Sequence, residues 1–182
     1  CGENKQNQFT ALVPAPSTSN SDAIEAPVDS TIKGFSHNHL NDYEVTSINI
    51  YGDEETTLNK PIRIFSPADV DVLMQLIYLN RSSGNFADYY VTMAASDGTY
   101  TLKFTGSTTD IKVGYGTKEW RDNFTDYCNY WLKKYGLEKT FLTYLRDVMQ
   151  LNGVGLYKIN SNDTIDQVTL TVNNKIIKTP CP

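Results

Sequence analysis

Alternating apolar and polar positions divide most of the chain into short strands. Residues 31–36 predict a strand that runs directly into a His-Asn-His triplet. Two alternating runs at 89–95 and 100–104 flank Ser96-Asp97-Gly98-Thr99 and predict a hairpin. The remaining strand predictions are residues 9–13, 45–51, 155–159, 167–172 and 175–178, and the last three would form a small antiparallel sheet. Gly52-Asp53-Glu54-Glu55 predicts a turn.

Three segments follow helical spacing instead. Ser66-Pro67-Ala68-Asp69 opens the first, because serine is a favourable N-cap, proline fits the first turn and aspartate suits the helix dipole. Residues 118–135 and 137–151 predict two more helices, separated by Gly136. Together these elements predict a single domain of the α/β (α+β) class over residues 1–182. Residues 1–22 form either a tail or the first strand of that domain.

Composition supports a globular protein and excludes two classes of partner. The chain has 182 residues, of which 40% are hydrophobic and 20% charged. Net charge is −5, and lysine and arginine form no basic stripe, so we expect no nucleic-acid partner. No run reaches the ~20 apolar residues that a transmembrane segment needs.

The three cysteines predict neither a disulfide framework nor a zinc ribbon, because their number is odd and their spacing wide. Cys128 and Cys181 are either bridged or free thiols. Cys1, followed by small and polar residues, is typical of a mature bacterial lipoprotein and is therefore a candidate lipid anchor. That interpretation favours a secreted or an outer-membrane or periplasmic location. The alternative is that Cys1 only marks the start of a fragment.

The candidate chemical residues lie at the end of a predicted strand and at the start of a predicted helix. The only two histidines, His37 and His39, stand two positions apart, so on an extended strand both imidazoles point to the same side. Imidazole nitrogen is a preferred zinc ligand, and a catalytic zinc keeps three protein ligands and an open position. Asp69, in the first turn of the helix capped by Ser66, is the candidate third ligand. An isolated H-x-H pair is common outside metal sites, and here the order of strand, H-x-H and capped helix favours a Zn²⁺ centre.

That order of H-x-H and S-x-x-D resembles the motif of the JAMM (MPN) zinc metallopeptidases, and is closest to bacterial domains of this family, mostly from Bacteroidetes. The Thr179-Pro180-Cys181 ending belongs to the same resemblance. The resemblance implies a mixed central sheet flanked by helices, with C-terminal antiparallel strands. It maps His37, His39 and Asp69 to the metal ligands, and Ser66 to the serine that supports the oxyanion.

Two features differ from the family pattern. Leu40 stands where a proline usually follows the second histidine, and a long stretch separates H-x-H from S-x-x-D. Residues 41–63 therefore form an insertion, which we interpret as a lid or specificity loop because insertions near this point shape the substrate groove in the family.

The resemblance also requires a glutamate upstream of H-x-H as general base, which takes a proton from the attacking water. Glu3, just ahead of the predicted strand at residues 9–13, fits that position, and Glu25 is the alternative. An active Glu3 and a lipid on Cys1 compete, because the two residues are only two positions apart.

The sequence therefore supports three hypotheses. The first is a zinc-dependent metallopeptidase or isopeptidase that hydrolyses an amide bond in a peptide or protein substrate. The second is a non-catalytic JAMM-like binding or scaffold domain, displayed as a surface lipoprotein. The third is a small secreted interaction protein in which the H-x-H pair is incidental, and it predicts that the side chains of His37 and Asp69 point apart.

Overall fold

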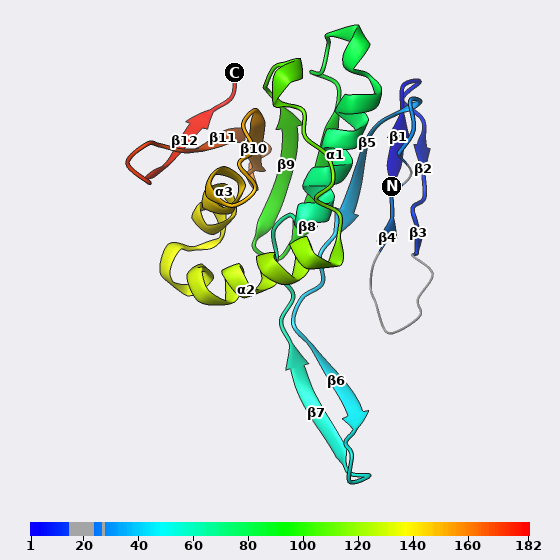
Figure 1. Ribbon diagram of the computed structural model, residues 1–182, viewed down its shortest axis with the longest axis vertical. Helices are drawn as coiled ribbons and strands as arrows, with labels where there is room; N and C mark the ends of the chain where they lie inside the picture. Colours follow the sequence, from blue (N-terminus) through cyan, green and yellow to red (C-terminus); the bar gives the residue numbers. More distant parts are fainter. Residues whose placement is uncertain (15–23, 27) are drawn as a thin grey trace.

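The computed structural model describes residues 1–14, 24–26 and 28–182, without the side chains of residues 13, 14, 24 and 25. Eight strands form one sheet, in the order β12-β11-β10-β9-β8-β5-β1-β2 (Figure 1). These strands are β1 (Gly2–Asn4), β2 (Phe9–Thr10), β5 (Ile32–Asn38), β8 (Tyr90–Ala95), β9 (Gly98–Phe104), β10 (Val154–Ile159), β11 (Ile165–Leu170) and β12 (Ile176–Pro180). Two further pairs are β3 (Val13–Pro14) with β4 (Ile24–Glu25), and β6 (Tyr43–Ile48) with β7 (Glu54–Asn59).

The large sheet is mixed. β5 and β8 run parallel, and every other neighbouring pair in this sheet is antiparallel. Parallel neighbours need a crossover connection, and the chain between β5 and β8 supplies one that contains helix α1 (Pro67–Leu79). The predicted mixed α/β architecture with antiparallel C-terminal strands is therefore confirmed.

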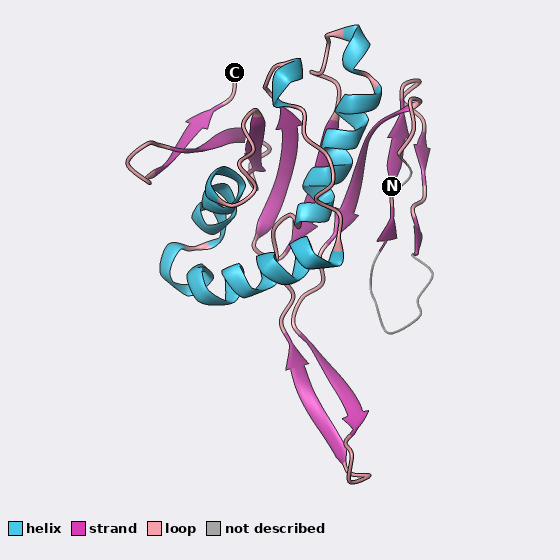
Figure 2. Ribbon diagram, in the orientation of Figure 1, coloured by secondary structure: helices cyan, strands magenta, loops and turns pink. Residues whose placement is uncertain are grey.

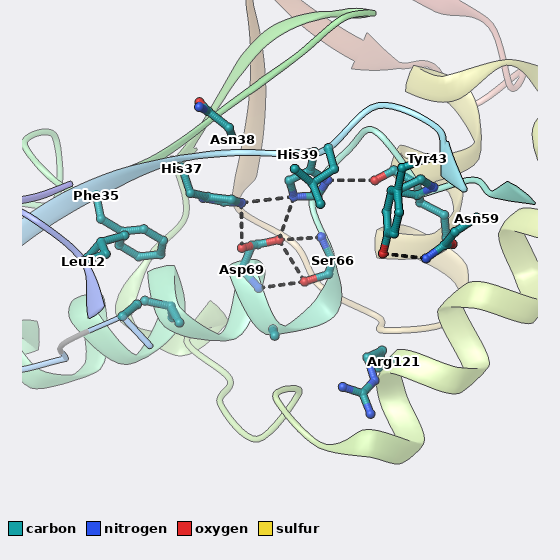
Figure 3. A pocket seen from close by; sticks show the side chains of 16 residues that line it. Leu12, Phe35, His37, Asn38, His39, Tyr43, Asn59, Ser66, Asp69 and Arg121 are labelled. Atoms are coloured by element: carbon teal, nitrogen blue, oxygen red, sulfur yellow. Dashed lines mark hydrogen bonds and ion pairs between the residues drawn. The ribbon is translucent and has the colours of Figure 1, made fainter. Parts of the chain in front are cut away.

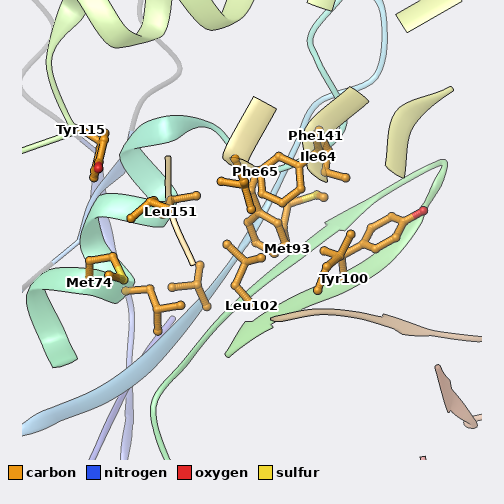
Figure 4. Packing of buried hydrophobic residues seen from close by; sticks show 14 of the residues in the cluster. Ile64, Phe65, Met74, Met93, Tyr100, Leu102, Tyr115, Phe141 and Leu151 are labelled. Atoms are coloured by element: carbon orange, nitrogen blue, oxygen red, sulfur yellow. The ribbon is translucent and has the colours of Figure 1, made fainter. Parts of the chain in front are cut away.

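The three α-helices of the described residues cover one face of the sheet (Figure 2). α1 packs on β5, β8 and β9, α3 (Leu137–Asp147) packs on β11, and α2 (Lys118–Tyr135) packs on both other helices. The alternation of the predicted hairpin accounts for the core, because Met93, Tyr100 and Leu102 point to the helix face and are buried (Figure 4). Val91, two positions before Met93 on the same strand, is buried too. Their strand neighbours point to the opposite face, which stays polar and partly exposed.

The insertion between H-x-H and S-x-x-D is a hairpin arm, formed by β6 and β7, that extends away from the body of the protein (Figure 1). The turn predicted at residues 52–55 is confirmed for Gly52 and Asp53 only, since Glu54 and Glu55 belong to β7 and the turn begins earlier. Asn49 starts the turn, because its side-chain oxygen accepts the backbone N–H groups of Tyr51 and Asp53. The strand predicted at residues 45–51 therefore ends early, at Ile48.

Two other boundaries differ from prediction. The strand expected at residues 9–13 is split, because β2 pairs with β1 while β3 pairs with β4, and Leu12 between them packs against the core. The helix expected to reach residue 151 ends at Asp147. Gln150 adopts a left-handed backbone with φ of 52°, which ends the helix and returns Leu151 to the core.

All three cysteines are free, with Cys1 exposed, Cys128 buried and Cys181 partly buried. Within the described residues, no helix combines the length and apolar character that crossing a bilayer demands.

Candidate metal centre

The two histidines lie at the end of β5, where the strand leaves the sheet beside β8. His37 pairs with Met93 of β8, and the backbone N–H of His39 donates to the carbonyl of Ala94 at 2.9 Å. This pairing keeps the segment extended, so both imidazoles point to the helix face, as the i, i+2 spacing predicts (Figure 3). The side chain of His37 is only 7% exposed.

The start of α1 holds the third group. Ser66 is the N-cap, and its Oγ accepts the backbone N–H of Asp69 at 3.3 Å. Asp69 completes a capping box, because its Oδ2 accepts the backbone N–H of Ser66 at 2.7 Å and the Ser66 hydroxyl at 2.8 Å. The capping box therefore fixes the orientation of the carboxylate and leaves Oδ1 directed at His37, whose Nε2 is 3.2 Å away.

The three side chains converge on one point. The Nε2 atoms of His37 and His39 are 3.1 Å apart, and His39 Nε2 lies 4.0 Å from Asp69 Oδ2. Ligands at about 2.0–2.1 Å from a tetrahedral zinc are separated by about 3.3 Å. The 3.1 and 3.2 Å spacings are close to this value, the 4.0 Å spacing is longer, and one ligand atom from each residue lies within 4.8 Å of the others. This His–His–Asp group could hold a metal ion, and it excludes the alternative in which His37 and Asp69 point apart.

The surroundings of the two imidazoles also bear on metal binding, which needs a ring nitrogen with a free lone pair. His39 Nδ1 lies 2.7 Å from the carbonyl of Ile62, which can only accept, so Nδ1 donates and Nε2 is the nitrogen directed at His37 and Asp69. Burial lowers the pKa of His37 and so favours its neutral form. The negative charge of Asp69 acts in the opposite direction but has the smaller effect. His37 Nδ1 is buried without a partner in the described part of the chain, so His37 lacks the support that Ile62 gives His39.

A cavity of about 490 Å³ opens onto the His–His–Asp group, within the usual range for small-ligand sites. Its apolar wall combines residues from the N-terminal region, β5 and α1, including Leu12, Phe35 and Val72. The base of the hairpin arm supplies Tyr43 and Asn59, joined by a 2.7 Å hydrogen bond from the Asn59 amide to the Tyr43 hydroxyl. Only the base of the segment interpreted as a lid thus borders the cavity, while its strands extend away (Figure 1).

Glu3 occupies a different environment. It pairs with Gly34 in β1, on the face of the sheet opposite to His37. Its carboxylate accepts a hydrogen bond from the Tyr90 hydroxyl and pairs with Lys33 Nζ at 2.9 Å, and these two contacts hold the pKa of Glu3 below its usual value. Glu3 does not line the cavity. The expectation that Glu3 is the general base therefore has no support in its position.

Glu25, the alternative base, lies in β4, where its backbone pairs with Val13, and its side chain lies outside the described residues. The next residue, Ala26, lines the cavity. Ser66 also lines the cavity, but its hydroxyl donates to Asp69, so its role here is to orient that carboxylate. The oxyanion role of Ser66 and the base role of Glu25 stay predictions.

Several cavity residues carry no signal in the sequence. Ile62 contributes only a backbone carbonyl, and Tyr43, Asn59 and Arg121 belong to segments with no recognisable motif. Only the tertiary structure brings these residues to the metal-binding group.

Comparison of the chain with protein-family models, with curated proteins and with solved structures gave no match in any of the three. The likeness to JAMM metallopeptidases therefore rests on the H-x-H and S-x-x-D residues, and the spatial convergence of His37, His39 and Asp69 is compatible with it.

Proposed function

We propose that this protein is a zinc-dependent hydrolase of amide bonds, a metallopeptidase or isopeptidase with a JAMM-like site. The observation that carries the proposal is the convergence of two imidazoles and one oriented carboxylate beside a cavity. Two nitrogen donors and one carboxylate favour zinc over the oxygen-seeking Mg²⁺ and Ca²⁺. Three protein ligands leave a position open for substrate or water, as in catalytic zinc sites.

Each residue has a defined task in this proposal. A bound zinc would supply Lewis-acid chemistry, polarising a substrate carbonyl and lowering the pKa of water. His37, His39 and Asp69 hold the ion, and Ser66 and Ile62 hold Asp69 and His39 in orientation. Glu25 is the proposed proton acceptor, because the residue beside it lines the cavity whereas Glu3 faces Lys33 and Tyr90.

Isothermal titration of the metal-free protein with Zn²⁺, supported by elemental analysis after reconstitution, tests the metal assignment. We expect one zinc per chain in the wild type and none in the double variant His37→Ala/His39→Ala. The same donor set also suits non-haem Fe²⁺, so an anaerobic titration with Fe²⁺ is the second arm. A wild-type protein that takes up neither ion would end the proposal.

A second candidate function is a metal-binding domain without turnover. Asp69 is the only carboxylate among the described residues that line the cavity, and this favours a site without its own general base. Zinc-loaded Glu25→Gln and Glu3→Gln proteins, assayed on peptide libraries, separate the two candidates. Hydrolysis that is lost in Glu25→Gln and kept in Glu3→Gln supports the peptidase. Absence of hydrolysis in the wild type supports the binding domain, for which lipidation of Cys1, checked by intact mass, would supply a surface anchor.

A further inference from the structure

The cavity beside the metal-binding group is bordered by a basic side chain at the start of α2. Arg121 is the only lysine or arginine among the described residues that line the cavity (Figure 3). Its side chain is 63% exposed, so a ligand in the cavity and solvent can both reach the guanidinium. The rest of the cavity wall is largely apolar, apart from the His–His–Asp group and the base of the arm.

The start of α2 is tied to the helix that carries Asp69. Asp71 of α1 is 4% exposed, and its Oδ1 accepts the backbone N–H groups of Gly114 and Tyr115 at 2.6 and 2.9 Å. Tyr115 then packs edge-on against Trp120, with ring centroids 5.0 Å apart. These contacts anchor the loop before α2 on α1, so Arg121 has a defined position relative to the metal ligands.

The guanidinium of Arg121 is also available for a ligand. Its only ion-pair partner within the described chain is Asp122, 3.9 Å away, and Lys118 already pairs with the other oxygen of that carboxylate. The arginine at the base of the arm differs, because Arg63 pairs with both Asp42 and Asp97 and does not line the cavity.

We propose that the cavity takes a peptide segment with an aliphatic side chain on the apolar wall and a carboxylate that pairs with Arg121. This inference rests on the proposed amide hydrolase and names its substrate class. A planar guanidinium with several N–H donors fits a carboxylate in both charge and shape, because two parallel N–H groups can donate to its two oxygens. The protein carries a net charge of −5, so an acidic peptide is not attracted by the molecule as a whole, and local pairing with Arg121 must provide the recognition.

Binding to the metal-free, ¹⁵N-labelled protein tests this proposal by chemical-shift titration with three peptides. N-acetyl-Leu-Ala has a free C-terminal carboxylate, its C-terminal amide has none, and N-acetyl-Leu-Glu-amide has only a side-chain carboxylate. We expect at least one carboxylate peptide to bind about fivefold tighter than the amide, the upper range for a solvent-exposed ion pair. Whichever carboxylate is preferred identifies its source. Equal affinity for all three peptides would overturn the proposal.

Arg121→Gln is the decisive variant, and Arg146→Gln is its matched control, because Arg146 lies on α3 and pairs with Asp147 outside the cavity. The preference for carboxylate should vanish in Arg121→Gln and persist in Arg146→Gln, with unchanged spectra elsewhere showing that both variants fold. In the wild type, the preference should shrink between 50 and 500 mM NaCl because salt screens an exposed pair. A preference that survives in Arg121→Gln assigns recognition to another residue and refutes this role.

N-acetyl-Asn-Ala tests the apolar wall, since replacing leucine by a polar side chain should weaken binding several-fold. Affinity equal to that of N-acetyl-Leu-Ala would refute the aliphatic half of the inference. If the protein takes up no zinc but still prefers carboxylate peptides, the hydrolase proposal is rejected and the peptide-binding cavity is kept. Zinc uptake with no carboxylate preference would keep the metal site and reject this substrate class.

Discussion

Replacing Asp69 should separate metal binding from helix capping, because the chain contains a second capping box without histidines nearby. Asp69 uses Oδ2 to accept two hydrogen bonds from Ser66, while Oδ1 faces His37 at 3.2 Å. Asp110 forms the same kind of capping box in an exposed 3₁₀ turn. Its Oδ2 accepts the backbone N–H and the hydroxyl of Ser107, both at 2.8 Å. Asp69→Asn therefore alters a cap and a ligand, whereas Asp110→Asn alters a cap alone.

The expected magnitude follows from ligand linkage. Zinc at 100 times its dissociation constant raises the free energy of unfolding by about 2.7 kcal/mol, and for a chain of this size that raises Tm by about 5–10 °C. The ligand atoms already converge, so zinc binding requires little rearrangement. If Asp69→Asn weakens zinc binding about 100-fold, the same zinc concentration adds only about 0.4 kcal/mol, or about 1 °C.

Differential scanning calorimetry with and without zinc measures this difference directly. Both variants should melt slightly below the wild type without zinc, since the amide keeps an acceptor oxygen but loses the negative charge that favours a helix N-terminus, at about 0.3–1 kcal/mol. Only Asp69→Asn should lose the zinc-induced rise in Tm, while Asp110→Asn keeps it. A zinc-induced rise in Asp69→Asn equal to that of the wild type would refute the assignment of Asp69 as a ligand.

Three further predictions concern the body of the protein. Gly34→Ala should lower the free energy of unfolding by about 1–3 kcal/mol in urea titrations, because its Cβ would lie 2.6 Å from the Tyr90 ring and 2.7 Å from the Tyr90 carbonyl oxygen; an unchanged midpoint would contradict this close packing. The Cys128 thiol should resist iodoacetamide at pH 8 until the protein unfolds, because burial raises its pKa to about 12; labelling of native protein, read by mass spectrometry, would argue against it. Because the folded-state pKa of Glu3 lies below its ordinary value, its contribution to stability is present above about pH 4.5 and is lost as pH falls through the folded-state pKa. Glu3→Gln should therefore be less stable than wild type at pH 6, with the difference narrowing towards pH 3; a difference independent of pH would show that Tyr90 and Lys33 do not lower the pKa of Glu3.

Local patterns in the sequence predicted the elements that depend on neighbouring residues. The alternation at residues 89–104 appears as the β8–β9 hairpin, and the Ser-Pro-Ala-Asp start appears as the capped beginning of α1. The spacing of His37 and His39 predicted that both rings share a side, because strand geometry fixes that relation within three residues. Turn residues were less informative, since the turn at the end of the arm begins at Asn49, ahead of the Gly52 that signalled it.

The sequence by itself thus determined two histidines on one side of a strand and a carboxylate in the first turn of a helix. Only the tertiary structure decided that these groups meet, because the parallel pairing of β5 with β8 and the packing of α1 depend on contacts between distant segments. The same long-range packing placed Glu3 on the opposite face of the sheet and brought Arg121 to the cavity. Side-chain periodicity gives the direction of a residue relative to its own element, whereas strand order and helix docking decide which directions converge.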